Sequence, residues 1–278
     1  MKRIIALLLA AAMVLSFAGC SKKAEGTSEK PSDKNENTID VSGVKLISDG
    51  KLTVGAEIGY PPFEDFADDG TTPVGFDIDL ATEIAEKLGL EVEFVNTGWD
   101  GIFQGIDVNY DCVISACTIT EDRLETMLFS TPYIQNYQTV VVTKDSDLTV
   151  ESFNDLDGKA IAVQKETTSD ILMSDYKDTG SIDVTIVANE KVISCFTQLE
   201  NGEIDAVVVD SSVADGYLAA NPDKFKIAYK DSAEPEEFGV AIGKNNTALL
   251  DVVNKAIAEL KDEGYIDDSI EYWFGSNN

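Results

Sequence analysis

The chain has 278 residues, 44% of them hydrophobic, which is enough for one large core or two smaller ones. It carries 51 acidic and 21 basic residues, and the resulting net charge of −30 argues against nucleic acid as a partner. The chain contains no histidine, which excludes Ser-His-Asp and Cys-His catalysis, histidine-ligated metals and histidine proton shuttles.

The first 19 residues are predicted to be a signal peptide. Lys2 and Arg3 form a positive start, and residues 4–15 form an apolar run that is short for a transmembrane helix. The sequence Phe17-Ala18-Gly19-Cys20 resembles a bacterial lipobox, in which the cysteine receives the lipid and becomes the new N-terminus. We expect lipidation of Cys20 and an extracytoplasmic protein anchored to the cell membrane; an ordinary secretory signal with a chance cysteine is the alternative.

Residues 20–44 are predicted to be a lipidated cysteine followed by a disordered tether. Residues 21–37 consist mainly of Ser, Lys, Glu, Asp and Asn, with almost nothing to bury. No later segment has the length and hydrophobicity of a transmembrane helix. We therefore expect a globular part held at the membrane by its lipid.

Short β-branched runs alternate with helical patterns from residue 45 onward. The expected strands are residues 52–56, 92–95, 112–115, 139–143, 160–164, 184–187, 206–209 and 239–242. The expected helices are residues 79–88, a helix capped by Asn189 and ended by Gly202, and residues 249–260. Apolar strands alternating with helices indicate an α/β fold with mostly parallel sheets. Asp111 and Asp205 each stand between a helix and an apolar strand, a weak repeat that two similar lobes would produce.

Two breaks in this pattern suggest that the chain crosses between two lobes. They are residues 132–138, which lead into a strand, and residues 234–237, which precede another. If both cross, the first lobe comprises residues 45–136 and 238–278, and the second comprises residues 137–237. Two crossing strands would form a hinge, and hinge closure around a ligand is a known motion.

The sequence predicts no metal site and no cofactor. Cys112, Cys117 and Cys195 lack zinc-site spacing, and a disulfide framework is not expected in a chain of this size. Cys112 and Cys195 are interpreted as small buried residues, and Cys117 as a residue near the site. Residues 64–70 are interpreted as an exposed acidic turn, because Phe76 stands where a calcium loop needs a bidentate glutamate.

Several motifs follow one another in a specific order and spacing: Tyr60-Pro61-Pro62-Phe63-Glu64, Val74-Gly75-Phe76-Asp77, Trp99-Asp100, the run from Asp111 to Arg123, Gln164-Lys165-Glu166-Thr167-Thr168, and Asp205 to Asp210. Together they resemble the bacterial extracellular solute-binding proteins of family 3, the polar amino-acid receptors of ABC importers. The resemblance covers nearly all of residues 45–278. It implies a two-lobed, periplasmic-binding-protein-like (type II) fold with a two-strand hinge. It also implies a monomer that binds an amino acid and delivers it to a permease.

A free amino acid is a zwitterion, so a closing cleft must replace the hydration of both charges. The resemblance implies that Arg123 grips the ligand α-carboxylate and that the Thr118 hydroxyl helps to hold it. Thr120 is a plausible N-cap that places Arg123 in the first turn of a helix, near unpaired backbone N–H groups. The alternative is a surface arginine that pairs with Glu121 or Asp122.

The remaining site residues are also implied by the resemblance. Asp210 pairs with the α-ammonium, with a simple helix N-cap as the alternative, and the carbonyl of Ala116 accepts from the same ammonium. Tyr60 and Trp99 form aromatic walls, although a core position also suits an aromatic residue. Glu57 meets the end of the ligand side chain and favours a basic ligand; the alternative is a solvated acid.

The second lobe supplies a threonine pair, Thr167 and Thr168, near the carboxylate. Glu166 departs from the glycine that the family usually has before this pair. Its side chain puts the donor geometry in doubt and adds negative charge.

The sequence leaves arginine, lysine, histidine, ornithine, glutamine and cystine open as ligands, with a basic side chain preferred. Binding without catalysis is the leading hypothesis. The alternative is a dehydratase-like enzyme on the same scaffold, with Glu166 or Glu57 as a general acid.

Overall fold

A computed structural model describes residues 38–275. The predicted signal peptide, Cys20 and most of the predicted tether lie outside the described residues. In this part of the chain, no helix combines the length and hydrophobicity that crossing a membrane requires. The same residues hold no group of acidic, cysteine or histidine side chains arranged to bind a metal ion.

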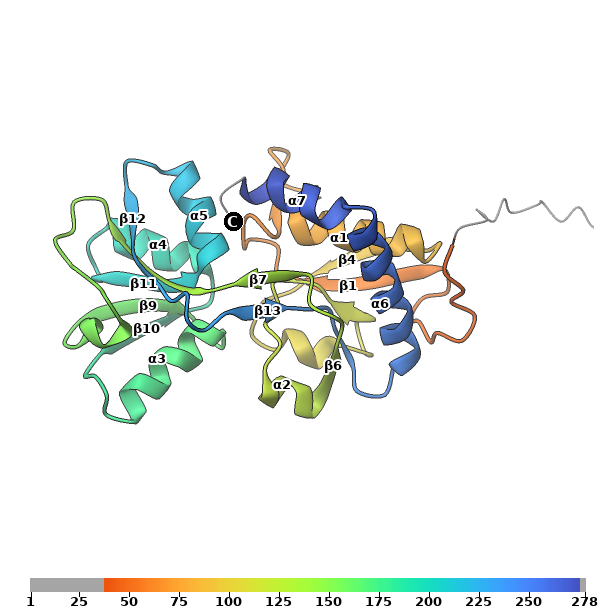
Figure 1. Ribbon diagram of the computed structural model, residues 1–278, viewed down its shortest axis with the longest axis horizontal. Coiled ribbons are helices and arrows are strands. Elements are labelled where there is room, and N and C mark those ends of the chain that lie inside the picture. Colours follow the sequence, from red (N-terminus) through yellow and green to blue (C-terminus); the bar gives the residue numbers. More distant parts are fainter. Residues whose placement is uncertain (1–37, 276–278) are drawn as a thin grey trace, which may run out of the picture. The chain divides into compact units, whose positions relative to one another are not determined.

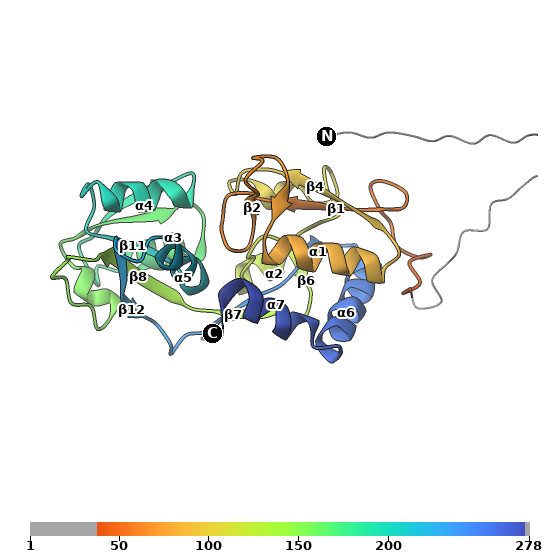
Figure 2. The same ribbon diagram turned by 90° about the horizontal axis from the view of Figure 1, so that it is seen from above.

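Two five-stranded sheets organise the described residues (Figures 1 and 2). The first sheet has the order β4-β1-β5-β14-β6, with bounds Glu91–Asn96, Lys51–Ala56, Cys112–Val113, Ala241–Gly243 and Met127–Phe129. The second has the order β10-β9-β11-β8-β12, with bounds Thr185–Asn189, Ala160–Gln164, Ala206–Asp210, Gln138–Thr143 and Phe225–Lys230. In each sheet one strand, β14 or β8, runs antiparallel to both of its neighbours, and the other strands share one direction. The predicted α/β fold with mostly parallel sheets is therefore confirmed.

Two antiparallel strands run between the sheets (Figure 1). They are β7 (Ile134–Asn136) and β13 (Glu236–Phe238), paired over three residues. β7 lies within residues 132–138, and β13 begins within residues 234–237 and ends one residue beyond them. The exact lobe boundaries, and bending at this link, stay predictions. A further short pair joins β2 (Asp65–Phe66) to β3 (Pro73–Val74).

Helices cover both sheets. Their bounds are α1 Phe76–Lys87, α2 Glu121–Thr126, α3 Thr168–Asp178, α4 Val192–Glu200, α5 Ser211–Ala220, α6 Thr247–Asp262 and α7 Tyr265–Phe274, with 3-10 turns η1 Ile102–Gly105 and η2 Phe153–Leu156.

The side chains of the second sheet alternate between two apolar clusters. Val141, Val207 and Val209 pack with α4 and α5, whereas Val140 and Val208 pack with α3. This period of two is why the strands are apolar throughout.

Asp111 and Asp205 occupy equivalent places in the two sheets. Each precedes the central strand of its sheet, β5 or β11. Asp111 accepts the backbone N–H of Thr53 in β1 at 2.8 Å, and Asp205 accepts that of Ala160 in β9 at 2.8 Å. Each carboxylate therefore fixes the start of the strand next to it, which gives the repeat in the sequence a structural reason.

Gly75 precedes α1 in a conformation that suits glycine. Its φ is +139°, and a Cβ added there would lie 2.1 Å from the backbone oxygen of Phe63. This close approach sets the path from the Tyr60–Glu64 motif into α1, whose first turn carries Asp77.

Three expectations need correction. Asn189 does not cap α4: it is the last residue of β10, and Lys191 holds the N-cap position. The exposed acidic turn begins at Asp65, because Glu64 is fully buried. The chain contacts the core before residue 45, since the backbone N–H of Ile39 donates to the carbonyl of Lys87 at 2.9 Å. Apolar side chains at residues 39, 41 and 44 explain this early packing.

Cys112, Cys117 and Cys195 are buried free cysteines, as expected for the first and the last. Cys117 lies between two residues that line the cavity described below, Ala116 and Thr118, but does not line it itself. Burial raises the pKa of all three thiols.

Candidate functional site

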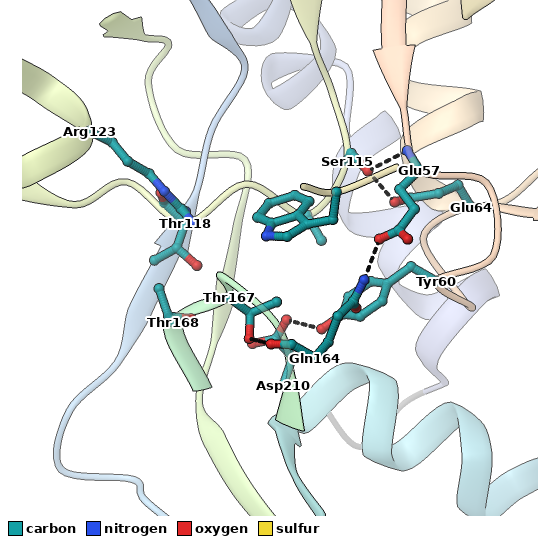
Figure 3. A pocket seen from close by; sticks show the side chains of 12 residues that line it. Glu57, Tyr60, Glu64, Ser115, Thr118, Arg123, Gln164, Thr167, Thr168 and Asp210 are labelled. Atoms are coloured by element: carbon teal, nitrogen blue, oxygen red, sulfur yellow. Dashed lines mark hydrogen bonds between the residues drawn. The ribbon is translucent and has the colours of Figure 1, made fainter. Parts of the chain in front are cut away.

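The carboxyl ends of parallel strands from both sheets surround one cavity (Figure 3). Its lining residues lie at the ends of β1, β4, β5, β9 and β11 or after them: Glu57, Tyr60, Glu64, Trp99, Ser115, Ala116, Thr118, Arg123, Gln164, Thr167, Thr168 and Asp210. In α/β proteins this edge of the sheet is where ligands bind. The space between these residues, including solvent at its mouth, has a volume of about 300 Å³. Hydrogen bonds from Tyr60 to Asp210 and from Gln164 to Glu57 cross this space, so the two lobes contact each other around the site.

Arg123 lies at one end of this cavity. The Thr120 hydroxyl accepts the backbone N–H of Arg123 at 3.2 Å, so the predicted cap of α2 is confirmed. Arg123 Nη1 donates to the carbonyl of Thr118 at 2.8 Å. Its Cζ lies 5.5 Å from the ring centroid of Trp99 and 5.0 Å from that of Phe103. These contacts hold the guanidinium in place.

The charge of Arg123 is not neutralised locally. Within residues 38–275, no ion pair joins Arg123 to Glu121 or Asp122, the alternative that the sequence left open. Burial lowers the pKa of Arg123, whereas the nearby charges of Glu236 and Asp210 act in the opposite direction. A half-buried guanidinium without a direct carboxylate partner suits an anionic ligand.

Asp210 lies on the other lobe. It occupies the N-cap position of α5 without making a side-chain cap bond. Its Oδ2 accepts the Tyr60 hydroxyl at 2.5 Å, and its Oδ1 accepts Asn136 Nδ2 at 2.7 Å and Gln138 Nε2 at 3.1 Å. Burial, followed by the charge of Glu236, raises the pKa of Asp210 to about 7. The side chain therefore faces the cavity, and Tyr60 joins it to the first lobe.

Glu236, on β13, accepts hydrogen bonds from the hydroxyl groups near the Arg123 end of the cavity. Its carboxylate accepts from Gln138 Nε2 at 3.1 Å and from Asn136 Nδ2 at 3.3 Å. The hydroxyls of Thr118 and Thr168 donate to it, each at 3.3 Å. An incoming carboxylate would thus compete with Glu236 for these two hydroxyls.

The opposite end of the cavity is acidic (Figure 3). Glu57 is 2% exposed; its Oε2 accepts Gln164 Nε2 at 2.6 Å, and its Oε1 lies 2.8 Å from Lys191 Nζ. The Ser115 hydroxyl accepts the backbone N–H of Glu57 at 3.0 Å and donates to Glu64 Oε1. Glu57 thus follows a first-lobe strand while both of its partners, Gln164 and Lys191, come from the second lobe.

Some acceptors at the acidic end have no donor. Glu64 Oε2 and Gln164 Oε1 are buried without a hydrogen-bond partner, and both residues line the cavity. Burial raises the pKa of Glu64 far above its usual value, the charge of Asp77 adds to the rise, and Lys191 opposes it. Because buried polar atoms are almost always paired, this end of the cavity lacks donors that a ligand can supply.

A buried acid holds the wall beside Ala116. The backbone N–H of Ala116 donates to Asp77 Oδ2 at 2.6 Å, and the Tyr133 hydroxyl donates to the same oxygen at 3.1 Å. Ala116 has φ +47°, in the left-handed region. Asp77 thus fixes an unusual backbone conformation at the cavity wall.

The threonine pair lies at the start of α3. The Thr167 hydroxyl donates to the carbonyl of Gln164 at 2.7 Å and accepts the backbone N–H of Asp170 at 3.3 Å as the helix cap. Thr168 Oγ1 accepts Gln138 Nε2 at 3.1 Å. Both residues line the cavity.

Glu166 is the predicted site residue that does not line the cavity. Its side chain is 51% exposed and lies 3.7 Å from Lys165 Nζ. Its φ is +62°, which explains why a glycine suits this position. Its carbonyl accepts Trp99 Nε1 at 3.1 Å, so it supports the aromatic wall through its backbone. The predicted negative charge of Glu166 therefore points to solvent.

Sequence reasoning missed several residues around the cavity. Glu64, Ser115 and Gln164 each stand next to or inside a motif that was assigned a role, and this adjacency was the available signal. Lys191 belongs to no such motif, and nothing in the sequence distinguishes it from other surface charges. Glu236 lies in residues 234–237, which were interpreted only as a crossing between lobes.

Comparisons with known proteins agree with this geometry. Residues 52–276 match the model of the bacterial extracellular solute-binding proteins, family 3. The chain is 33% identical to ABC transporter arginine-binding protein 1 of Escherichia coli strain K12, covering 81% of this chain and 90% of that protein. It is 32% identical to the L-cystine-binding protein TcyJ of the same strain, covering 84% and 86%.

Solved structures are similar as well. A P235GK mutant of ArgBP from T. maritima has a TM-score of 0.76 and 40% identity, covering 82% of this chain and 96% of that one. The ancestral amino acid-binding protein AncCDT-1, a precursor of cyclohexadienyl dehydratase, has a TM-score of 0.74 and 36% identity, covering 81% and 96%. The chain therefore belongs to the bacterial extracellular solute-binding proteins of family 3.

Proposed function

We propose that this protein binds a basic amino acid outside the cytoplasm and delivers it to the permease of an ABC importer, with the lipid on Cys20 holding it at the membrane. One observation carries the proposal. A single cavity has the guanidinium of Arg123 at one end, the carboxylate of Asp210 on the facing lobe, and unpaired acceptors at the far end.

The backbone charges of an amino acid match the first two groups. Arg123 and the hydroxyls of Thr118 and Thr168 supply donors for the α-carboxylate. Asp210 supplies the acceptor for the α-ammonium, and Tyr60 and Trp99 enclose the carbon atoms between. Removing either charged partner would leave one ligand charge buried and unpaired, which costs about 3–5 kcal/mol.

The acidic end favours a ligand whose side chain donates hydrogen bonds. Glu57, Glu64 Oε2 and Gln164 Oε1 present acceptors there. A guanidinium has five N–H donors, an ammonium three and an imidazolium two. Arginine is the first candidate, because its five donors best match the several acceptors at this end of the cavity. In addition, two of the similar proteins are named for arginine.

Ligand-driven closure requires that the ligand interact more favourably with the closed state than with the open one. The cavity meets this requirement because its two charged groups lie on different lobes. Contacts such as Tyr60 to Asp210 and Gln164 to Glu57 already join the lobes across the cavity. A bound amino acid adds its own contacts to both sides.

The test is a thermal-shift screen of amino acids followed by calorimetry. A specific ligand should raise the melting temperature, by RT ln(1 + [L]/Kd) in free energy. Arg123→Ala and Asp210→Ala should each abolish the shift while the protein stays folded. Asp215→Asn, a control on α5 outside the cavity lining, should keep it. Unchanged affinity in either cavity variant would contradict the proposal.

A dehydratase-like enzyme is the second candidate, favoured by one of the similar structures, a precursor of such an enzyme. Glu64 is the cavity acid whose burial favours the protonated form that a general acid needs. Glu166, one of the two acids that the sequence put forward, points to solvent. Turnover of a cyclic carboxylic acid by the purified protein, lost in Glu64→Gln, would replace binding as the function.

A further inference from the structure

Lys191 brings one of the protein's own cations to Glu57, an acid that lines the cavity, although Lys191 does not line the cavity itself. It stands between β10 and α4 and reaches across to the other lobe, where its Nζ lies 2.8 Å from Glu57 Oε1. The Glu57 side chain is 2% exposed, whereas that of Lys191 is 41% exposed. A surface lysine thus extends inward to a buried acid.

The contact has the features of a replaceable one. The Lys191 ammonium, 2.8 Å away, is the one partner of Glu57 Oε1 among the described residues. The other oxygen, Oε2, is held by Gln164 at 2.6 Å, so Glu57 stays in place if the lysine leaves. A lysine stem is long and flexible, and this one keeps much of its surface in water.

We propose that Lys191 determines which side chains the cavity accepts, by holding on Glu57 the position that a ligand cation would take. This inference rests on the proposed function. A ligand with a cationic end must displace Lys191 and then pairs with Glu57 itself. A ligand with a neutral end leaves the Lys191–Glu57 pair intact inside the closed complex.

The two ligand classes should respond differently when Lys191 loses its charge. Without it, a cationic ligand no longer has a competitor. A neutral ligand then closes the lobes over a buried, unpaired Glu57, a state that is costly. The ratio of the two dissociation constants should therefore change even if the closed state itself becomes less stable.

Lys165 provides a matched control. Its Nζ lies 2.8 Å from Asp100 Oδ2, it also joins the two lobes, and its side chain is also 41% exposed. Asp100 is 47% exposed, however, and neither residue lines the cavity. Removing this pair should affect closure equally for every ligand.

The experiment compares L-arginine with L-citrulline, a neutral ligand of similar size, by calorimetry on wild type, Lys191→Met and Lys165→Met. We expect the ratio of the citrulline Kd to the arginine Kd to rise on the order of tenfold or more in Lys191→Met, the effect of unpairing a partly buried charge. The ratio should stay at its wild-type value in Lys165→Met. Circular dichroism checks that both variants are folded. Lys191→Met should not destabilise α4, because the Lys191 side chain makes no cap bond to that helix.

The outcomes separate this inference from the proposed function. An unchanged or lower ratio in Lys191→Met overturns the role of Lys191 while binding itself stands. If wild type binds citrulline but not arginine, Lys191→Met should gain arginine binding, and no gain overturns the role. A wild-type protein that binds no amino acid in the screen overturns the proposed function and this inference together.

Discussion

Amino-acid binding should weaken steeply below pH 7, because Asp210 then takes up a proton. Burial and the neighbouring charge of Glu236 raise the pKa of Asp210 to about 7, although hydrogen bonds from Tyr60, Asn136 and Gln138 oppose the rise. Only the ionised carboxylate can pair with an ammonium. The chain has no histidine, so no side chain with an ordinary pKa titrates between pH 5 and pH 7.

The size of the effect follows from the ionised fraction. With a pKa of about 7, about one tenth of Asp210 is ionised at pH 6 and about one hundredth at pH 5. The apparent Kd should therefore rise about fivefold from pH 7 to pH 6, where half of Asp210 is ionised at the start, and about tenfold, or about 1.4 kcal/mol, from pH 6 to pH 5. The α-carboxylate and α-ammonium of the ligand keep their charges across this range.

The stability of the ligand-free protein should rise as pH falls, whereas the affinity for the amino acid should decrease. The pKa of Asp210 is raised from 3.8, so the folded protein holds a proton that the unfolded chain releases between these values. The free energy of unfolding therefore falls as pH rises through this window. The melting temperature of the ligand-free protein should fall from pH 5 to pH 8, while the increase caused by ligand should grow.

Calorimetry at pH 5, 6, 7 and 8, in pairs of buffers with different ionisation enthalpies, measures both the affinity and the protons released. Asp210→Asn should bind weakly with a much smaller pH slope, since Asp77 and Glu64, whose pKa values are also raised by burial, can still take up protons. Glu236→Gln should move the midpoint to lower pH. Asp215→Asn is the control, because burial raises the pKa of Asp215 outside the cavity lining. A wild-type slope that persists in Asp210→Asn would refute the assignment.

Two substitutions test backbone features of the site. Glu166→Gly should leave amino-acid affinity within about threefold of wild type, because Trp99 bonds to the backbone oxygen of residue 166. The same substitution should raise the melting temperature by up to about 2–4 °C. Relief of the backbone strain at positive φ, about 1–2 kcal/mol, exceeds the entropic cost of glycine. Loss of binding in this variant would mean that the side chain acts in the cavity. Gly75→Ala should lower the melting temperature by roughly 6–12 °C, from about 3 kcal/mol of overlap with Phe63. Gly59→Ala, at a similar φ of +134° with no atom near its Cβ, should cost clearly less; equal losses would show that strain rather than overlap is responsible.

Local pattern was sufficient for much of the fold. The apolar run at residues 160–164 corresponds to β9 without change of bounds, because a strand buried on both faces must be apolar throughout. Asn189 was misread because a polar residue after an apolar run resembles a cap. In the structure it pairs with Gln164 in the sheet register, and its side chain donates to Gln198. Sheet register decides such positions, and it depends on a strand far away in the sequence.

The site was predictable where one motif carries it and unpredictable where two lobes meet. Thr120 and Arg123 are three residues apart, so local spacing revealed the cap of α2, whereas the role of Arg123 came from the family resemblance and stays a prediction. Lys191 reaches Glu57 from the other lobe, and Glu236 reaches Thr118 because β13 runs beside the segment that holds Thr118. Such contacts leave no pattern in either segment alone.

The three buried thiols make the described part of the molecule convenient for labelling. A thiol reacts as its thiolate, and burial both hides these sulfurs and disfavours that form. A cysteine introduced at Val108 and another at Ile193, which are 69% and 53% exposed, would take up maleimide dyes in preference to the native ones. Energy transfer between the two dyes would then follow opening and closing in real time, with none of these three cysteines removed.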